Sequence, residues 1–216
     1  MKKQLFQTLR EEAYSAVVAD VLDSLGFPNQ ILPSRIRPLE GSGAIVGTVR
    51  TILVRDVQSA SAHPYEVEFS LVDDLNQDDV VVAACGDREA AFWGELLSTA
   101  SAKRGAVGAV IDGFCRDVRQ IRDLGFPVFA RGTNPGDSKG RCEPVERDKP
   151  IQIGGVRIAS GDAVFADLDG VVIIPSQVID ETAALALEKV RGERTVFNAL
   201  QSGMSTREAY DRWGIL

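Results

Sequence analysis

Residues 94–117 read GELLSTASAKRGAVGAVIDGFCRD, a stretch that predicts a helix followed by a strand. The helix covers residues 93–104, and the strand at residues 107–111 has no polar interruption. Such strands are usually buried on both faces, as in parallel sheets that are flanked by helices. The stretch therefore predicts an α/β fold that is built around a parallel sheet.

Chemically active side chains stand at both ends of this stretch. Gly94 and Glu95 open the helix, and Arg116 and Asp117 follow the strand. A helix-loop-strand excursion of this length can return the chain to where it began, so we expect these four residues to share one pocket. N–H groups at a helix start and an arginine suit an anionic substrate, and carboxylates suit a hard divalent cation.

The flanking sequence extends the alternation of helices and strands. Helices are expected at residues 3–12, 16–26, 65–75, 117–124 and 177–201. Strands are expected at residues 43–54, 79–84, 127–130, 151–153, 156–158, 163–167 and 171–174. Residues 131–149 are expected to form a loop, and Ser205 with Glu208 forms a capping box for a last short helix. We expect one α/β domain over residues 1–216, of which 177–216 form a helical C-terminal extension.

The composition excludes some classes of function. The hydrophobic fraction is 44% and the charged fraction is 25%, which is ordinary for a soluble globular protein. The net charge of -7 and the lack of a basic patch disfavour a nucleic-acid partner. A small anionic substrate needs only one well-placed arginine and stays open.

Cysteine spacing and hydropathy indicate the compartment. Cys85, Cys115 and Cys142 lie far apart and form no C-x-x-C pair, which favours free thiols in a reducing cytosol over a zinc site. The N-terminal residues lack the apolar core of a signal peptide, and no apolar run reaches membrane-spanning length. We therefore expect a cytoplasmic protein with no membrane partner.

Three longer runs resemble a known family. They are AFWGELLSTASAKRGAVGAVIDGFCRD (91–117), GFPVFARGTNPGDSKGR (125–141) and IASGDAVFADLDGVVIIP (158–175). They resemble the RraA-like family, which includes the class II 4-hydroxy-4-methyl-2-oxoglutarate/4-carboxy-4-hydroxy-2-oxoadipate aldolases. The resemblance implies a three-layer β/β/α swivelling-domain fold with a mostly parallel central sheet and a long C-terminal helix. It also implies a homotrimer or homohexamer with sites at subunit interfaces.

The resemblance also implies roles for single residues. Asp117 would ligate Mg2+ or Mn2+, and Arg116 would bind the pyruvyl moiety. Glu95 occupies a position where the family's aldolases have Asp, and a glutamate from the neighbouring subunit matches Glu193, which otherwise would lie on a solvated helix face. Arg116, Glu95 and Glu193 are thus the expected catalytic residues. The expected substrate-binding residues are Gly94, Glu95, Leu96, Leu97 and Arg116.

The implied reaction is cleavage of a 4-hydroxy-2-oxo acid to pyruvate and a second oxo acid, together with oxaloacetate decarboxylation. Such cleavage passes through an enolate, which a lysine Schiff base or a metal ion can stabilise. None of the six lysines lies in a recognisably buried apolar strand, so the metal is favoured. One alternative is an RraA-type protein that binds and regulates ribonuclease E. The regulators lack the Asp that this chain keeps at position 117. Another is a lyase for a different hydroxy-oxo acid.

Each candidate also has a purely structural interpretation. Asp117 would cap a helix, Glu95 would be a first-turn acid favoured by the helix dipole, and Gly94 would be a packing glycine. Leu96 and Leu97 are expected to have core side chains. Five charged residues are candidates for the pocket rim, although exposed or ion-paired loop positions are favoured for them: Asp87, Arg88, Arg131, Asp137 and Arg141.

Overall fold

The computed structural model describes residues 2–40 and 43–215. Its helices are α1 (Lys2–Glu12), α2 (Ser15–Ser24), α3 (Glu66–Asp73), α4 (Glu95–Arg104), α5 (Val118–Leu124), η1 (Ser176–Val178, a 3-10 helix), α6 (Ile179–Gln201) and α7 (Thr206–Trp213). Its strands are β1 (Arg37–Pro38), β2 (Ile45–Asp56), β3 (Asp79–Ala84), β4 (Ala91–Trp93), β5 (Gly108–Cys115), β6 (Val128–Thr133), β7 (Cys142–Arg147), β8 (Ile151–Ile153), β9 (Val156–Ile158), β10 (Ala163–Ala166) and β11 (Val171–Ile174).

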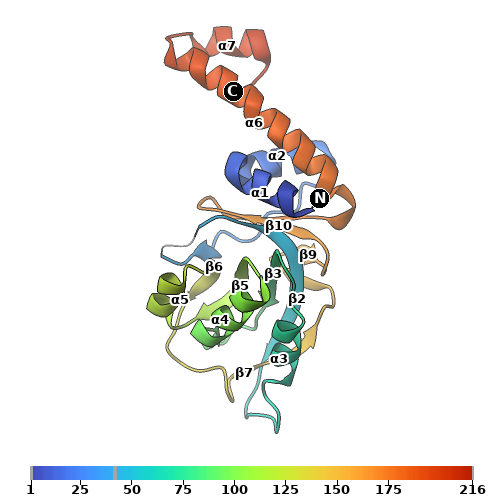
Figure 1. Ribbon diagram of the computed structural model, residues 1–216, viewed down its shortest axis with the longest axis vertical. Coiled ribbons are helices and arrows are strands. Elements are labelled where there is room, and N and C mark those ends of the chain that lie inside the picture. Colours follow the sequence, from blue (N-terminus) through green and yellow to red (C-terminus); the bar gives the residue numbers. More distant parts are fainter. Residues whose placement is uncertain (1, 41–42, 216) are drawn as a thin grey trace.

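Nine strands of the described chain form one curled sheet. Its order is β1-β6-β5-β3-β2-β10-β11, with β4 paired to β5 and β7 paired to β2. The central pairs β2–β3, β3–β5, β5–β6 and β4–β5 are parallel, whereas the pairs that involve β1, β7, β10 and β11 are antiparallel. The expected parallel centre is confirmed, and antiparallel strands complete the sheet on both sides (Figure 1).

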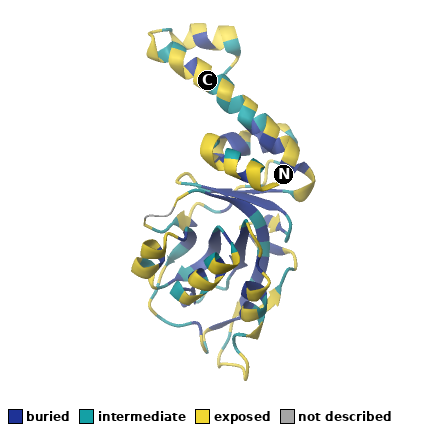
Figure 2. Ribbon diagram, viewed as in Figure 1, coloured by how far each residue is buried: buried dark blue, intermediate teal, exposed yellow. Residues whose placement is uncertain are grey.

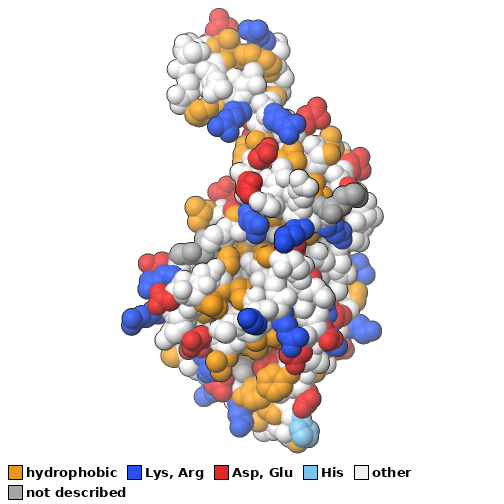
Figure 3. Space-filling view, in the orientation of Figure 1, with side chains coloured by type: hydrophobic (Ala, Val, Ile, Leu, Met, Phe, Trp, Pro, Cys, Tyr) orange, Lys and Arg blue, Asp and Glu red, His pale blue; other side chains and the backbone are white. Residues whose placement is uncertain are grey.

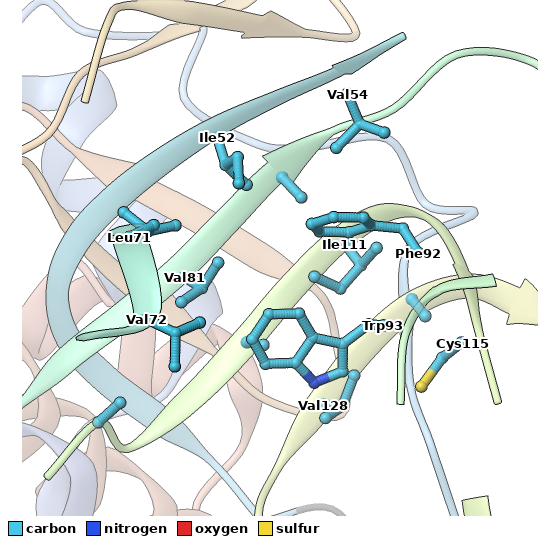
Figure 4. Packing of buried hydrophobic residues seen from close by; sticks show 14 of the residues in the cluster. Ile52, Val54, Leu71, Val72, Val81, Phe92, Trp93, Ile111, Cys115 and Val128 are labelled. Atoms are coloured by element: carbon cyan, nitrogen blue, oxygen red, sulfur yellow. The ribbon is translucent and has the colours of Figure 1, made fainter. Parts of the chain in front are cut away.

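One face of the sheet is covered by α3, α4 and α5. The buried cluster between them includes Leu71 of α3, Ile111 of β5 and Ile121 of α5, and Figure 4 shows the rings of Phe92 and Trp93 among the aliphatic side chains. Trp93 is 1% exposed. Truncating a buried aromatic of this size typically costs about 3–5 kcal/mol, so this cluster gives the end of β4 a rigid support.

The opposite face of the sheet is covered by the β8–β9 hairpin. Ile153 and Ile158 of the hairpin pack with Val80 and Val82 of β3 and with Val110 of β5. A small sheet, the large sheet and a helical layer therefore lie one on another. This is the three-layer β/β/α arrangement that the resemblance implied, and it is confirmed.

A third buried cluster joins the N-terminal helices to the far edge of the sheet. Phe6 of α1 and Leu22 of α2 pack with Phe165 of β10, Val172 of β11 and the first half of α6. From there α6 runs away from the body and carries α7 at its far end (Figure 1). Figure 2 shows that the buried residues concentrate in the sheet, whereas this helical arm is mostly exposed or intermediate. The expected long helix and the Ser205–Glu208 capping box are both confirmed.

The expectation of a continuous loop over residues 131–149 is wrong in part. β6 continues to Thr133, and β7 pairs antiparallel with β2 over Cys142–Arg147. This strand contains Pro144 and three charged residues, a composition that is depleted in strands, so tertiary pairing overrides local preference. The three-residue strand β4 was also not expected, because residues 91–93 are too short to show a period.

The structure shows the state of the three thiols and the character of the helices. Cys85, Cys115 and Cys142 are free, as their spacing predicted. Among the helices of residues 2–40 and 43–215, none is long and apolar enough to cross a membrane. Figure 3 shows basic and acidic side chains interspersed over the visible face, rather than gathered into a patch of one sign.

Candidate active site

Two neighbouring parallel strands end at the candidate site. Gly94 follows β4, Arg116 and Asp117 follow β5, and the two strands pair in parallel. The backbone N–H of Arg116 donates to the carbonyl oxygen of Trp93 at 2.9 Å. Ligands of open α/β sheets bind beyond the carboxyl ends of the strands. The convergence that the sequence predicted is therefore present in the fold.

Gly94 allows the two chain segments to touch. A methyl group added at Gly94 would lie 2.8 Å from Oδ2 of Asp117 and 3.2 Å from Cγ of Arg116. Two hydrogen bonds fix the backbone at Gly94, between β4 and α4. Nε1 of Trp93 donates to Oγ of Ser98 at 2.8 Å, and this hydroxyl donates to the Gly94 carbonyl at 2.9 Å. Any larger residue at position 94 would have to displace the site residues themselves.

Asp117 stands at the N-cap of α5 but does not cap this helix with its side chain. Its Oδ2 instead accepts the backbone N–H of Glu95, the first residue of α4, at 3.2 Å. The φ of 59° places Asp117 in the left-handed region, which costs an L-residue about 1–2 kcal/mol. Such strain persists only where the surrounding structure fixes it. Because the side chain makes no cap hydrogen bond, the helix-cap interpretation of this carboxylate does not hold.

Arg116 is only partly satisfied by protein groups. Its Nη1 lies 3.2 Å from Oδ1 of Asp137, its Nε lies 3.7 Å from Oδ2 of Asp117, and 37% of its side chain is exposed. The loop that carries Asp137 is held to the start of β4, because Ala91 N–H donates to the Gly136 carbonyl at 2.8 Å. The guanidinium thus keeps donors that are available to a ligand.

These residues line a cavity of about 310 Å3. Arg116 is the only lysine or arginine among its lining residues in the described chain, beside three carboxylic acids. The wall is otherwise largely apolar and aromatic. The lining residues are Tyr65, Glu68, Phe69, Ala91, Phe92, Trp93, Gly94, Leu96, Leu97, Arg116, Asp117, Asp137 and Ser138.

Asp137 is the one rim candidate of the five that lines this cavity. Arg131 instead lies 3.1 Å, Nε to Oδ1, from the buried Asp112, and Asp87 is fully exposed. Arg88 donates from Nη1 to the carbonyl of Val57 at 2.8 Å. Arg141 donates from Nη1 to the carbonyl of Asp137 at 2.9 Å. Asp137 is ion-paired, as was favoured for it, but its partner is Arg116 and it also lines the cavity.

Glu68 is a site residue that the sequence interpretation missed. It lies in α3, lines the cavity and is 6% exposed. Burial raises the pKa of its carboxyl to about 7, and the negative charge of Asp137 adds to this shift. A usable signal existed, because Glu68 precedes the core residues Leu71 and Val72 by three and four positions and so shares their helix face.

The first turn of α4 is placed as expected, but two of its side chains are not. The N–H of Glu95 meets Asp117, whereas the Glu95 side chain is not among the groups that line the cavity. Leu96 is 79% exposed, so its expected core position is wrong, because the start of α4 faces the cavity. Leu97 is half-buried, lines the cavity and packs on the core.

Glu193 lies on α6 and does not line the cavity of its own chain. It accepts a hydrogen bond from the Tyr14 hydroxyl, and its Oε1 lies 3.9 Å from Nζ of Lys189. Burial, with this carboxylate, raises the pKa of Tyr14 to about 12. Figure 1 shows α6 leaving the body beyond β10, on the side remote from α4. A role for Glu193 in catalysis thus requires a second copy of the chain.

The donor set at the cavity fits a hard divalent cation that keeps most of its waters. Asp117 and Asp137 both line the cavity with side chains that are 39% exposed. The described residues contain no cluster of three or more His, Cys, Asp or Glu with metal-binding geometry. Mg2+ typically takes one or two protein carboxylates and completes its shell with water, so a sparse oxygen set is what this ion uses.

Comparison with known proteins identifies the family. A family model described as RraA-like, Aldolase/RraA, matches residues 15–173. The chain belongs to the RraA-like family. The matched residues contain the whole cavity lining of this RraA-like protein, whereas Glu193 and α7 lie beyond them.

Several relatives of this RraA-like chain are similar over most of its length. A Halalkalibacterium halodurans protein named "Putative 4-hydroxy-4-methyl-2-oxoglutarate aldolase" is 32% identical over 193 residues, which are 89% of this chain and 87% of that protein. Protein DlpA of Legionella pneumophila is 31% identical over 202 residues, which are 90% of this chain but only 31% of DlpA. This chain thus spans about a third of the length of DlpA.

A solved structure is similar in fold. Streptomyces coelicolor RraAS2, described as an unusual member of the RNase ES inhibitor RraA protein family, superposes with a TM-score of 0.80 at 26% identity. The match covers 92% of this chain and 98% of that one. This chain is therefore similar in sequence to a relative named for an aldolase and similar in fold to a structure named for a nuclease-inhibitor family.

Proposed function

We propose that this RraA-like protein is a divalent-metal-dependent lyase. It cleaves a 4-hydroxy-2-oxo acid, such as 4-hydroxy-4-methyl-2-oxoglutarate, to pyruvate and a second oxo acid, and it also decarboxylates oxaloacetate. The observation that carries the proposal is the strained, half-exposed Asp117 beside the unsatisfied Arg116 in one cavity. The aldolase name of a relative at 32% identity supports the reaction class.

Each of these cavity residues has a separate role in the proposed reaction. Asp117 would hold Mg2+ or Mn2+, which when bound supplies a Lewis acid for the 2-oxo group of the substrate. Arg116 donates hydrogen bonds to the developing enolate oxygen. The free N–H groups of the first turn of α4, at Leu96 and Leu97, accommodate the C1 carboxylate. The apolar wall around them reduces the access of water.

Asp117 provides the direct test of this function. Pyruvate release from oxaloacetate is measured for the wild type and Asp117→Ala, each with Mg2+ and with EDTA. We expect turnover in the wild type with metal, and none in the variant or after chelation. Asp123→Ala is the matched control, since Asp123 lies on α5 with a side chain that is 60% exposed and does not line the cavity. Turnover that survives EDTA or the Asp117 substitution contradicts the proposal.

We also propose that Glu193 of one subunit completes the site of another, in a homotrimer or homohexamer. Phe197, one turn further along α6, is 57% exposed, and Tyr210 of α7 is 52% exposed, which supports a covering neighbour. Glu95 is assigned to the same site, where it would order a water rather than touch the substrate. Mixed oligomers of Glu193→Ala and Asp117→Ala subunits should recover part of the activity, and verified mixed oligomers without any recovery would exclude a shared site.

The second candidate is a binding regulator of ribonuclease E, and it is favoured by the fold similarity to RraAS2. Asp117 argues for the enzyme, since a protein-binding surface has no need for a strained carboxylate inside a cavity. Capture of the ribonuclease by a protein without lyase activity would reverse this order. Activity on another hydroxy-oxo acid, with none on 4-hydroxy-4-methyl-2-oxoglutarate, would keep the chemistry and change the substrate.

A further inference from the structure

One acid of the cavity has no task in the steps proposed above. The carboxyl of Glu68 lines the same cavity as Arg116, and Glu68 is 6% exposed. Burying a carboxyl this far costs free energy in the folded state and calls for a reason. A ligand in the cavity would supply a hydrogen-bond partner for it.

Glu68 is also linked electrostatically, through Asp137, to Arg116, the residue that would bind the reacting oxygen. Asp137 lies 3.2 Å, Oδ1 to Nη1, from Arg116, and the charge of the same Asp137 acts on Glu68. The cavity of about 310 Å3 that these three side chains line is the size of a small organic acid with a few waters. A substrate held by Arg116 would therefore occupy the cavity that Glu68 lines.

We propose that Glu68 is a catalytic acid–base residue that transfers a proton to and from C3 of the pyruvate moiety. This inference rests on the proposed pyruvate-forming reaction. In cleavage, the C4 hydroxyl loses its proton to solvent, the C4 oxygen becomes a carbonyl, and the electrons of the broken C3–C4 bond form the enolate. Glu68 in its acid form gives a proton to C3, which completes the methyl group, and the resulting carboxylate regains a proton from solvent.

The protonation of Glu68 suits this role. Burial raises its pKa to about 7, so both its acid and its base form are populated near neutral pH, where proton transfer is most effective. The charge of Asp137 acts in the same direction. The elements that pack against α3 are α4, β7 and β2. Their charged and titratable residues are Glu95, Lys103 and Arg104 of α4, Cys142, Glu143, Glu146 and Arg147 of β7, and Arg50, Arg55 and Asp56 of β2. Tyr65, which directly precedes α3, lines the same cavity as Arg116 and Asp137.

Exchange of the methyl protons of pyruvate isolates this step from carbon–carbon cleavage. The protein is incubated with pyruvate and Mg2+ in D2O, and the methyl signal is followed by proton NMR. Glu68→Gln keeps the size of the side chain and removes its acid, and we expect it to slow the exchange by about 100-fold or more. Glu66→Gln is the matched control, since Glu66 is exposed on the same helix, and it should exchange at the wild-type rate. The pyruvate concentration at half-saturation should change by less than about threefold in Glu68→Gln, as for a residue that acts on rate rather than on binding.

The pH profile of the wild type gives a second test that needs no variant. Removal of a methyl proton requires the carboxylate form of Glu68, so the exchange rate should rise with an inflection near pH 7. An inflection at the ordinary pKa of glutamate, or an unchanged rate in Glu68→Gln, overturns the role of Glu68 while pyruvate release from oxaloacetate continues. A wild type that neither exchanges pyruvate nor releases it from oxaloacetate overturns the proposed function, and this inference with it.

Discussion

Two arginine–aspartate clusters in this protein differ in how fully they are satisfied. In the first, Nε and Nη2 of Arg50 lie 2.8 and 2.9 Å from the two carboxylate oxygens of Asp148, and Nη1 donates to the Asp74 carbonyl and to Asp79. The Arg50 side chain is 16% exposed. Hydrogen bonds from Arg50 and Ser160, together with the positive charge of Arg50, hold the pKa of Asp148 below its usual range. Burial acts in the opposite direction.

The second cluster, at Arg116, contains the same residue types, but its arginine makes fewer and longer contacts than Arg50 does. Its two ion pairs measure 3.2 and 3.7 Å, and its arginine and both aspartates are more than a third exposed. Asp117 is strained, whereas the strain at the Arg50 cluster, a φ of 55° at Asp148, is offset by a bidentate pair. The Arg50 cluster is saturated, because protein groups use the donors of its arginine, and it joins β2 to the chain beyond β7. The Arg116 cluster is unsaturated, because its arginine still has donors available to a ligand.

The largest expected effect is the loss of activity in Asp117→Asn. Removing the proposed metal ligand should lower kcat with oxaloacetate by about 10³-fold, which corresponds to roughly 4 kcal/mol. The fold should persist, because asparagine tolerates the left-handed conformation. Steady-state assays and thermal unfolding of the same sample measure both effects. Asp148→Asn is the control with the opposite profile, and equal activity losses in the two variants would remove the distinction between the clusters.

The next largest loss of activity is expected when the planar guanidinium of Arg116 is replaced. Arg116→Lys keeps the charge but loses the planar pair of donors, so kcat should fall by about 10²–10³-fold. The unfolding midpoint should stay close to that of the wild type, since exposed ion pairs contribute at most about 1 kcal/mol. Kinetic assays over a range of oxaloacetate concentrations separate kcat from KM. An active Lys variant would show that Arg116 acts only as a diffuse positive charge.

A smaller effect, on stability alone, is expected at the other cluster. Arg50→Met removes the bidentate partner of Asp148 and the ion-pair partner of Asp79. Asp148 keeps Arg147 and Ser160, so the free energy of unfolding should fall by only about 2–3 kcal/mol. Activity per folded molecule should not change. Urea denaturation measures the loss, with Arg104→Met as control, because the exposed Arg104–Asp73 pair should contribute about 0–1 kcal/mol. Equal losses in both variants would contradict the structural role of the saturated cluster.

The smallest effect is a pH dependence. The pKa of Asp148 is lower in the folded than in the unfolded protein, so its contribution is fully present above the unfolded value of about 4 and is lost as the pH falls through the folded value. The stability difference between wild type and Asp148→Asn should thus be constant at neutral pH and shrink below about pH 4. Urea midpoints at several pH values measure it, and a difference that grows in acid would contradict the sign.

The sequence predicted the parts of the site that follow from local pattern. An uninterrupted apolar strand between a glycine-led helix and an Arg-Asp pair is enough to place Arg116 and Asp117 next to Gly94, because a helix-loop-strand excursion of this length returns the chain to where it began. The short strands at residues 151–153 and 156–158 and the capping box at Ser205 follow from equally local rules.

The parts that escaped depend on contacts between distant segments. Asp137 reaches Arg116 because its loop is bonded to β4 and β5, and nothing in its local sequence distinguishes it from the other charged loop residues. β7 forms because β2 offers it an edge. Glu68 was missed because an acid in a helix is usually solvated, although its spacing from the core residues of α3 carried the information.

The most direct test of the account is calorimetric binding of oxalate, a planar mimic of the pyruvate enolate, in the presence of Mn2+. We expect the wild type and Asp148→Asn to bind oxalate equally and only when Mn2+ is present, and we expect Asp117→Asn to bind it at least about 100-fold more weakly. Equal binding by Asp117→Asn, or binding that does not depend on Mn2+, would contradict the claim that the unsaturated cluster is a metal-assisted oxo-acid site.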